Sequence, residues 1–451
     1  MKKQKGLYVD TGCALPHISL YCFATLCVQQ FILLKRSFEQ KKSIMNQMFR
    51  NLSTIAHSAS AMVFILLLAA CGYRSAPKAG GEGATAETAS LQGVAAIDTS
   101  VYETLAMLPT TPVKDQGHNE LCWLYAMTAT IESEHAAQGD SVNIGVDYTA
   151  RQYLTHLAHR YYFARDAQAM TLRGTAPMAV TLLRHFGAMP YDSYHGMGDE
   201  SAVAAARSLL SDGSQAAASE GSQDVATSTS LSSDCSKPAL PLRPVARRLM
   251  LAARQQPSFG GYKQVVERLL DESMGPMPLH VYMFGAEYSP VDFAQSVCSP
   301  GEWQAVTSFT HHPFGEAFDL EVADNRLHEQ FLNLPLDTMM TMIKRSLLDR
   351  HPVCWEGDIS ERGFSWPDGM ADLSLSMSRC TQQKRQLMFE RRLTTDNHCM
   401  ALIGLVRRRS DGTLFFVAKN SWGSSNRHHG FMLLSEKYVR MKTVGVCLRE
   451  K

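Results

Sequence analysis

The stretch PVKDQGHNELCW, residues 112–123, holds the most informative pattern in this chain of 451 residues. Loop-forming residues precede Cys122, and apolar residues then recur at helical spacing until Gly139 stops the pattern. We therefore predict a helix over 122–138 with a thiol at its first position. Because a helix N-terminus favours negative charge, this position predisposes the cysteine to form a reactive thiolate.

A second pattern far downstream predicts a β-hairpin. An apolar run at 400–406 and a β-forming run at 413–419 flank the turn signal Ser-Asp-Gly at 410–412. His398 precedes the first strand and Asn420 follows the second, so both side chains should emerge at the open end of the hairpin. An asparagine there can accept the imidazole N–H and hold the ring in one tautomer.

Gln116 supplies the fourth part of the pattern. Its side chain and the backbone N–H of Cys122 can both donate hydrogen bonds to an oxyanion that forms during attack on a carbonyl. Each element alone has an ordinary explanation, since a cysteine beside a tryptophan is usually a buried apolar residue and a lone histidine is usually structural. Their joint occurrence in this order favours nucleophilic catalysis by the thiol.

The chain resembles the papain superfamily and, within it, the bleomycin hydrolase or aminopeptidase C branch. The stretches that carry the likeness are CWLYA at 122–126, GTAP at 174–177, HFGAMP at 185–190 and RHPVCWEGD at 350–358. The likeness covers residues 95–451 and is weakest between 195 and 300. It implies an α+β, papain-like two-lobed fold, in which a helical lobe and a β-barrel-like lobe face each other across a cleft, with inserted segments.

The resemblance also implies a function. It predicts a cysteine peptidase that hydrolyses peptide bonds through a thioester on Cys122, as an aminopeptidase or broad peptidase acting on peptides or proteins without a cofactor. The residue roles that it implies are Cys122 as nucleophile, His398 as base, Asn420 as orienting group and Gln116 as oxyanion donor, with Gly174 and Trp422 on the substrate side of the site.

Two features leave the specificity open. Members of the bleomycin hydrolase branch are hexamers whose C-terminal arm enters the cleft, but only 31 residues follow Asn420 here and 438–448 read as a final core strand. Endopeptidase action is therefore an alternative, and a homo-oligomer is possible.

Two further alternatives are a transglutaminase-like acyl transferase and a catalytically silent, surface-anchored binding protein. The asparagine within Asn-Ser-Trp-Gly argues against the first, and the complete set of four site residues argues against the second.

The N-terminal region is predicted to be a leader over 1–71. A ten-residue apolar core at 61–70 suits a signal peptide, and the ending Leu-Ala-Ala-Cys resembles a bacterial lipobox with Cys71 as the lipidated residue. An ordinary signal peptide or a buried apolar segment is the alternative. The apolar stretch at 18–34 is either an anchor or part of an over-extended start, and true initiation at Met45 or Met48 is the favoured interpretation. Residues 72–94 then form a flexible tether, which places the enzyme on a bacterial cell envelope, lipid-anchored at the outer membrane or periplasmic face.

Composition bounds the rest of the chain. The net charge of +1 gives no basic face for nucleic acid. Residues 95–451 are predicted as the peptidase domain, mainly helical to 210 and alternating helices with strands from 245. The Ser/Ala/Gly-rich segment 211–241 between these parts is predicted to be a disordered insertion, with a cleavable activation loop as the alternative.

Cysteine and histidine spacing predicts no metal site. The eleven cysteines contain no Cys-x-x-Cys pair, and the histidine pairs 311–312 and 428–429 are predicted to be surface residues whose side chains point apart. Cys122 is expected to be a free thiol. The other cysteines of the domain could pair in unknown connectivity, and Cys399 is predicted to be buried and inert.

Overall fold

The computed structural model describes residues 97–194, 239, 241–283 and 286–450, within a compact unit over 87–451. The predicted leader, its lipidation site Cys71 and the tether at 72–94 lie outside the described residues. So does almost all of the predicted insertion at 211–241. Among the helices that the structure describes, none is long and apolar enough to span a bilayer.

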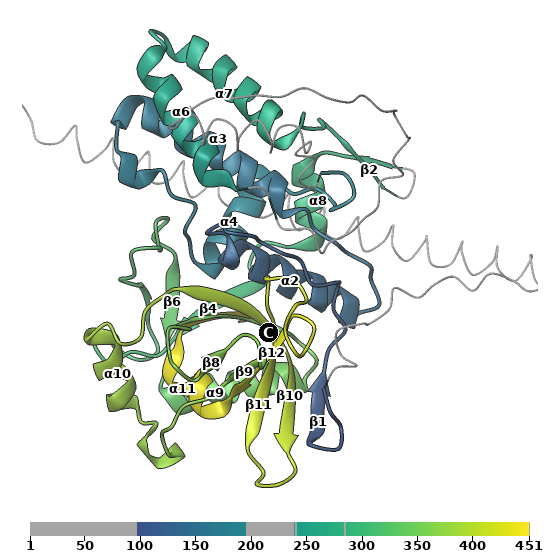
Figure 1. The fold of residues 1–451 in the computed structure, drawn as a ribbon, viewed down its shortest axis with the longest axis vertical. Helices are drawn as coiled ribbons and strands as arrows, with labels where there is room; N and C mark the ends of the chain where they lie inside the picture. The colour runs from purple at the N-terminus through teal and green to yellow at the C-terminus, as the bar shows by residue number, and fades with distance from the viewer. Residues whose placement is uncertain (1–96, 195–238, 240, 284–285, 451) are drawn as a thin grey trace, which may run out of the picture. The chain divides into compact units, whose positions relative to one another are not determined.

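A group of helices forms one half of the described unit, shown in the upper part of Figure 1. The packing of α3 against α6 and α7, and of α4 against α8, buries their apolar faces in one core. A small hairpin of β2 (Val281–Met283) and β3 (Ala286–Tyr288) accompanies them. The helices are α2 (Cys122–Ala137), α3 (Val146–Ala164), α4 (Ala176–Phe186), α6 (Leu242–Gln255), α7 (Phe259–Met274) and α8 (Pro290–Val297).

A large, mostly antiparallel sheet forms the other half, in the order β5-β6-β4-β13-β7-β10-β11-β12-β9-β8, with β1 paired to β10. Its strands are β1 (Tyr102–Met107), β4 (Trp303–Thr307), β5 (Ala317–Asp319), β6 (Gln330–Asn333), β7 (Val353–Gly357), β8 (Phe364–Ser365), β9 (Met370–Ala371), β10 (His398–Arg408), β11 (Leu414–Lys419), β12 (Phe431–Ser435) and β13 (Thr443–Arg449). The accompanying helices are α9 (Leu336–Leu348), α10 (Gln382–Glu390) and α11 (Glu436–Lys442). The predicted α+β class and two-lobed arrangement are confirmed.

Helix α2 lies between the two halves and packs on α4, β7 and β10 (Figure 1). Its predicted start is confirmed and its predicted end is one residue too long. Glu132 and Glu134, two acidic residues of this helix, are both buried. Glu132 Oε1 accepts hydrogen bonds from Lys114 Nζ at 2.6 Å and from the Ile144 backbone N–H at 2.7 Å. A helix enclosed on all sides can carry acidic groups only where cations and N–H donors compensate their burial.

The hairpin predicted around residues 410–412 is confirmed as β10 and β11, which pair antiparallel and project from the sheet in Figure 1. The predicted final strand over 438–448 is only partly right. Residues up to Lys442 form α11, which begins where the Ser435 side chain caps the Tyr438 N–H, and β13 follows. Strand β13 then lies between β4 and β7, in the middle of the sheet.

The predicted division at residue 245 is also refined. Helices α6 and α7 follow that point in sequence but pack on α3, in the helical half, because their apolar faces complete its core. Strands of the sheet begin only at Trp303, apart from β1. The chain therefore crosses to the sheet later than its composition suggests.

Candidate active site

The open end of the β10–β11 hairpin brings His398 and Asn420 together. His398 Nε2 lies 2.8 Å from Asn420 Oδ1, and the Ser421 backbone N–H donates to the same oxygen at 2.8 Å. Since that oxygen can only accept, Nε2 carries the ring proton, and Nδ1 is left as the basic nitrogen. Both residues are buried, so water competes little for this hydrogen bond.

Cys122 is the first residue of α2 and is partly exposed. A hydrogen bond from the Cys399 thiol, together with the hydrogen bond and charge of His398, holds the pKa of Cys122 well below its ordinary value. These effects outweigh burial, which acts in the opposite direction. The three side chains of the predicted triad therefore form one contiguous chain from sulfur to imidazole to amide. This arrangement can generate a thiolate and hold a proton beside it.

Gln116 lies in the loop before α2 and is fixed at both ends of its amide. Ser421 Oγ donates to Gln116 Oε1 at 2.6 Å, and Gln116 Nε2 donates to the Asn119 carbonyl at 2.7 Å. One of the two N–H groups on Nε2 remains for another acceptor, because a primary amide carries two donors. Gln116 and Cys122 both line the same cavity, where an oxyanion would form.

Trp422 covers the imidazole. The ring centroids of Trp422 and His398 are 4.7 Å apart with the planes inclined at 37°, and Phe364 and Trp366 pack edge-on against Trp422. Such an aromatic cluster excludes water from the His398–Asn420 hydrogen bond. Trp422 also lines the cavity, so it contacts both the predicted base and the space for a substrate.

Gly174, predicted to lie on the substrate side of the site, lines the same cavity. A Cβ at this position would lie 2.8 Å from the indole of Trp123, whose Nε1 donates to the Leu172 carbonyl at 2.9 Å. Any larger residue would therefore displace either the loop or the first turn of α2. The glycine is required by this close approach to the residue beside the nucleophile.

The loop that leads into β10 is held by Asp358. This carboxylate accepts from the Thr395 backbone N–H at 2.7 Å, and Asn397 Oδ1 accepts from the Ile359 N–H at 2.9 Å. Asn397 therefore shapes the turn before His398. The Asp396 side chain instead lines the cavity beside Cys122.

The cavity at Cys122 has a volume of about 240 Å³, and its lining includes several charged residues. Arg173 pairs with Asp324, with Nε 2.8 Å from Oδ2, and Arg243 pairs with Glu120. Sequence reasoning missed these residues and the buried acid Glu356 in β7. The available signal was a glutamate inside the otherwise apolar strand VCWEG. A larger cavity of about 500 Å³, lined by Met342, Leu448 and other residues of α9 and β13, contains none of the predicted site residues.

The described cysteines are all free thiols. Cys399 is buried, as predicted, and burial raises its pKa well above the ordinary value, which keeps it protonated. Its contact with Cys122 was not predicted, since neighbours in sequence gave no indication that the two thiols would meet. Cys235 lies outside the described residues.

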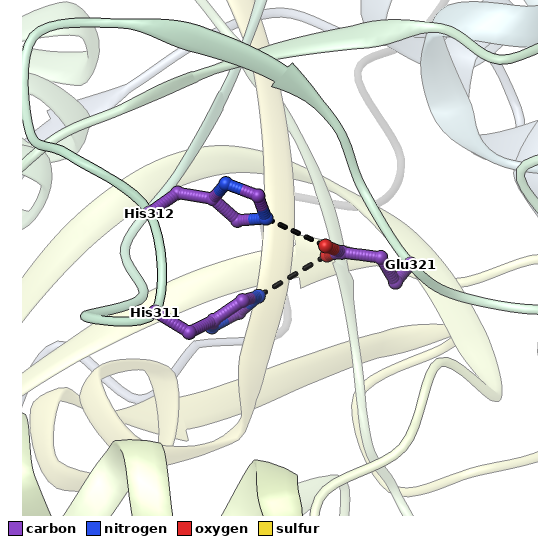
Figure 2. A group of neighbouring side chains, drawn as sticks. All are labelled: His311, His312 and Glu321. Atoms are coloured by element: carbon purple, nitrogen blue, oxygen red, sulfur yellow. Dashed lines mark hydrogen bonds and ion pairs between the residues drawn. The ribbon is translucent and has the colours of Figure 1, made fainter.

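The prediction for the histidine pair 311–312 is wrong in its geometry. Figure 2 shows both rings directed at Glu321, with His311 Nε2 3.1 Å from Oε2 and His312 Nε2 2.5 Å from Oε1. These residues lie in a turn, where successive side chains need not point apart. Their three ligand atoms lie within 4.8 Å of one another, as a metal site would require.

Neighbouring donors oppose metal binding by this group. Gln386 Oε1 accepts from the Thr310 backbone N–H at 2.7 Å, so its Nε2 faces His311 Nδ1 and donates to it at 3.0 Å. The proton of the neutral ring is then on Nε2, which donates to Glu321 and has no lone pair for a cation. The arrangement is a hydrogen-bonded cluster that joins the turn to α10.

Comparison with known proteins gives one family match and several similar solved structures. Residues 272–451 match the model of the Peptidase C1-like family. Among solved structures, PepW from Lactobacillus rhamnosis HN001 is similar with a TM-score of 0.51 and 15% identity, over 80% of this chain and 84% of that one. A structure from a study of the mite allergens Blo t 1 and Der p 1 has a TM-score of 0.36 and 11% identity, over 83% and 75% of the two chains. A search of curated protein sequences gave no significant match.

The family match over 272–451, the fold and the Cys–His–Asn arrangement together support a papain-like cysteine peptidase. The match over 272–451 includes His398 and Asn420 but begins after Cys122. That match supports a peptidase of the Peptidase C1-like family, and PepW is similar to this chain in fold.

Proposed function

We propose that this chain hydrolyses peptide bonds through a thioester on Cys122, with His398 as base and acid. The observation that supports the assignment most is the position of His398, which contacts the Cys122 sulfur on one side and Asn420 Oδ1 at 2.8 Å on the other. No other cysteine in the described residues has a lowered pKa.

The proposed reaction begins with attack of the Cys122 thiolate on the peptide carbonyl carbon, which forms a C–S bond and a tetrahedral oxyanion. Gln116 Nε2 and the Cys122 backbone N–H donate hydrogen bonds to that oxygen. The imidazolium of His398 then protonates the leaving amine as the C–N bond breaks. In the second half, His398 Nδ1 takes a proton from water, the hydroxide attacks the thioester, and the acid product leaves as the thiol is restored.

We propose exopeptidase action on short peptides as the specificity. The first turn of α6 lies across the loop between Gln116 and Cys122, since the Leu242 backbone N–H donates to Asn119 Oδ1 at 2.9 Å and Arg243 pairs with Glu120. Arg243 therefore forms part of the cavity wall beside Cys122. This wall limits the space beside Cys122, which favours a substrate with few residues between the cleaved peptide bond and the Arg243 side of the cavity. Its volume of about 240 Å³ lies below the roughly 300–1,000 Å³ of drug-sized sites.

The test compares fluorogenic peptides that differ only in a free or acetylated N-terminus, with peptides of three to ten residues followed by mass spectrometry. Exopeptidase action predicts release of one or two residues at a time from a terminus. Cleavage within long, doubly blocked peptides at comparable rates would replace this specificity with an endopeptidase. The Cys122→Ala variant must be inactive in every assay.

We further propose that Cys71 carries a lipid anchor that holds the enzyme at the bacterial cell envelope. The support is the apolar run at 61–70 and the ending Leu-Ala-Ala-Cys. Expression of the full chain in bacteria with a clickable fatty acid should label the wild type but not Cys71→Ala. Equal labelling of both, or of neither, would reject the anchor.

A further inference from the structure

Two carboxyl groups meet beside the cavity without a compensating cation. Glu356 in β7 is fully buried, and its Oε2 accepts from the Ala176 backbone N–H at 2.8 Å. Glu356 Oε1 and Asp396 Oδ2 are both buried and have no hydrogen-bond donor among the described residues. The two groups contact each other, so one proton shared between them satisfies both oxygens. We call Glu356 and Asp396 the carboxyl pair.

The carboxyl pair adjoins the nucleophile. In the β7–β10 register, Glu356 lies opposite Cys399, the residue whose thiol contacts Cys122. Asp396 lines the cavity together with Cys122 and Cys399. A chemical group bound by the carboxyl pair would therefore be part of the same peptide whose carbonyl carbon lies at the Cys122 sulfur.

The cations near the cavity are engaged elsewhere. Arg173 Nε lies 2.9 Å and 2.8 Å from the two carboxylate oxygens of Asp324, and it reaches Asp396 only through the backbone oxygen at 3.1 Å. Arg243 pairs with Glu120. In the described part of the chain, neither member of the carboxyl pair forms an ion pair with a lysine or arginine.

Burial in this setting favours the protonated form. It raises the pKa of Glu356 to about 8 and the pKa of Asp396 well above its ordinary value, with each acid opposing ionisation of the other. Two adjacent carboxylates cannot both be charged in a site of low polarity unless a positive charge joins them. A ligand cation that enters releases the shared proton to solvent and takes its place.

We propose that the carboxyl pair is a substrate subsite that binds a cationic group, an ammonium or a guanidinium, on the peptide attached at Cys122. This inference rests on the proposed function, since it concerns the substrate of the same site. The cation can come from a lysine or arginine side chain or from the free N-terminus of a short peptide. A neutral side chain of the same length would leave the carboxyl pair protonated and would gain no charge interaction.

The experiment measures ratios of kcat/KM with the purified full chain. One arm uses N-acetylated peptides with lysine or its neutral isostere norleucine at the first or second residue before the cleaved bond. The other arm compares free and acetylated N-termini on norleucine peptides. We expect a preference of about 10-fold or more for the cation in one of the two arms, which identifies its source. In Asp396→Asn and in Glu356→Gln that ratio should fall toward one.

Asp411→Asn is the matched control, because Asp411 is an acid at the exposed hairpin tip that pairs with Arg408. It should keep the wild-type ratio. Each ratio is internal to one preparation, so partial unfolding of a variant does not change it, and titration with an epoxysuccinyl inhibitor counts the active sites. If the inhibitor titrates the wild type but neither arm shows a preference for the cation, the subsite is rejected and the proposed function still stands. A preference retained in both variants would likewise reject the subsite, whereas failure of the titration itself would reject the proposed function.

Discussion

His398 Nε2 and Asn420 Oδ1 lie 2.8 Å apart at the open end of one hairpin. Residues 398 and 420 are thus placed by the pairing of β10 with β11, in which Ala401 lies opposite Lys419. Because the hairpin is held on both sides by β7 and β12, neither residue can move without disturbing the sheet. The base and the group that orients it are therefore a single rigid unit, against which α2 presents Cys122.

Loss of the orienting amide should impair catalysis more than binding. We expect Asn420→Ala to lower kcat by about 10²-fold with a smaller change in KM, because the imidazole loses its fixed tautomer. Steady-state kinetics on a fluorogenic peptide gives both constants. Asn143→Ala is the control, because Asn143 lies in the loop after α2 and outside the cavity at Cys122. An Asn420→Ala enzyme with unchanged kcat would remove the orienting role.

Gln116→Ala should lower kcat by about 10²-fold or more, as expected when one oxyanion donor is removed. Because Gln116 also accepts from Ser421 Oγ at 2.6 Å, the variant Ser421→Ala tests the cost of losing that contact alone. Ser421→Ala should retain most of the activity. If the two variants lose the same activity, Gln116 is structural and the oxyanion assignment fails.

The reactivity of Cys122 should depend on Cys399. The Cys399 thiol, followed by His398, lowers the pKa of Cys122, so the thiolate should persist well below the roughly 8.5 of an ordinary thiol. We expect Cys399→Ala to shift the pH profile of alkylation by iodoacetamide toward higher pH. Cys380→Ala, which removes a buried thiol outside the cavity, should leave the profile in place. Coincident profiles for wild type and Cys399→Ala would contradict this contact.

The buried ion pair of Lys114 and Glu132 should contribute to stability. Lys114 lies in the loop before the site, and Glu132 lies in α2, so the pair joins these two segments. Lys419, at the end of β11, donates to the Thr111 carbonyl of the same loop at 2.8 Å. We expect Glu132→Gln to lower the free energy of unfolding by about 3 kcal/mol at pH 7, because it leaves Lys114 buried without a counter-charge. Urea denaturation measures this, with the exposed Glu103→Gln as control.

The pH dependence of that effect has a defined sign. Burial raises the pKa of Glu132, but the charges of Lys114 and Lys419 outweigh burial and hold the pKa below its ordinary value. The stabilisation should therefore be complete above the unfolded pKa of about 4.3 and be lost as the pH falls through the lower folded pKa. If the difference in free energy of unfolding between wild type and Glu132→Gln is unchanged at pH 2, the charge of Glu132 is not the source of the stabilisation.

The fold was predictable where local signals and resemblance agreed. The start of α2 follows from the loop before Cys122, and the hairpin follows from β-forming runs around a turn. The burial of Glu132 was not predictable, because a periodic pattern cannot show that a helix is covered on every side. The placement of α6 and α7 with α3 depends on long-range packing, which a single sequence does not encode in any local window.

The candidate site divides in the same way. The four predicted residues Gln116, Cys122, His398 and Asn420 were recognisable because each stands in a local context of loop, helix or strand end. The carboxyl pair was not, since Glu356 and Asp396 are 40 positions apart and meet only through the β7–β10 pairing. The convergence of the two histidines on Glu321 escaped prediction for the same reason, because it depends on the path of a turn.

The most direct test of the central claim is covalent labelling of the full chain by an epoxysuccinyl cysteine-peptidase inhibitor, measured by intact mass and peptide mapping. We predict one equivalent of label, all of it on Cys122, and none on the Cys122→Ser variant or on the wild type after prior alkylation. The other described cysteines are buried thiols and should remain unmodified. A wild type that takes up no label, or a Cys122→Ser variant labelled to the same extent, would contradict the assignment of Cys122 as the nucleophile.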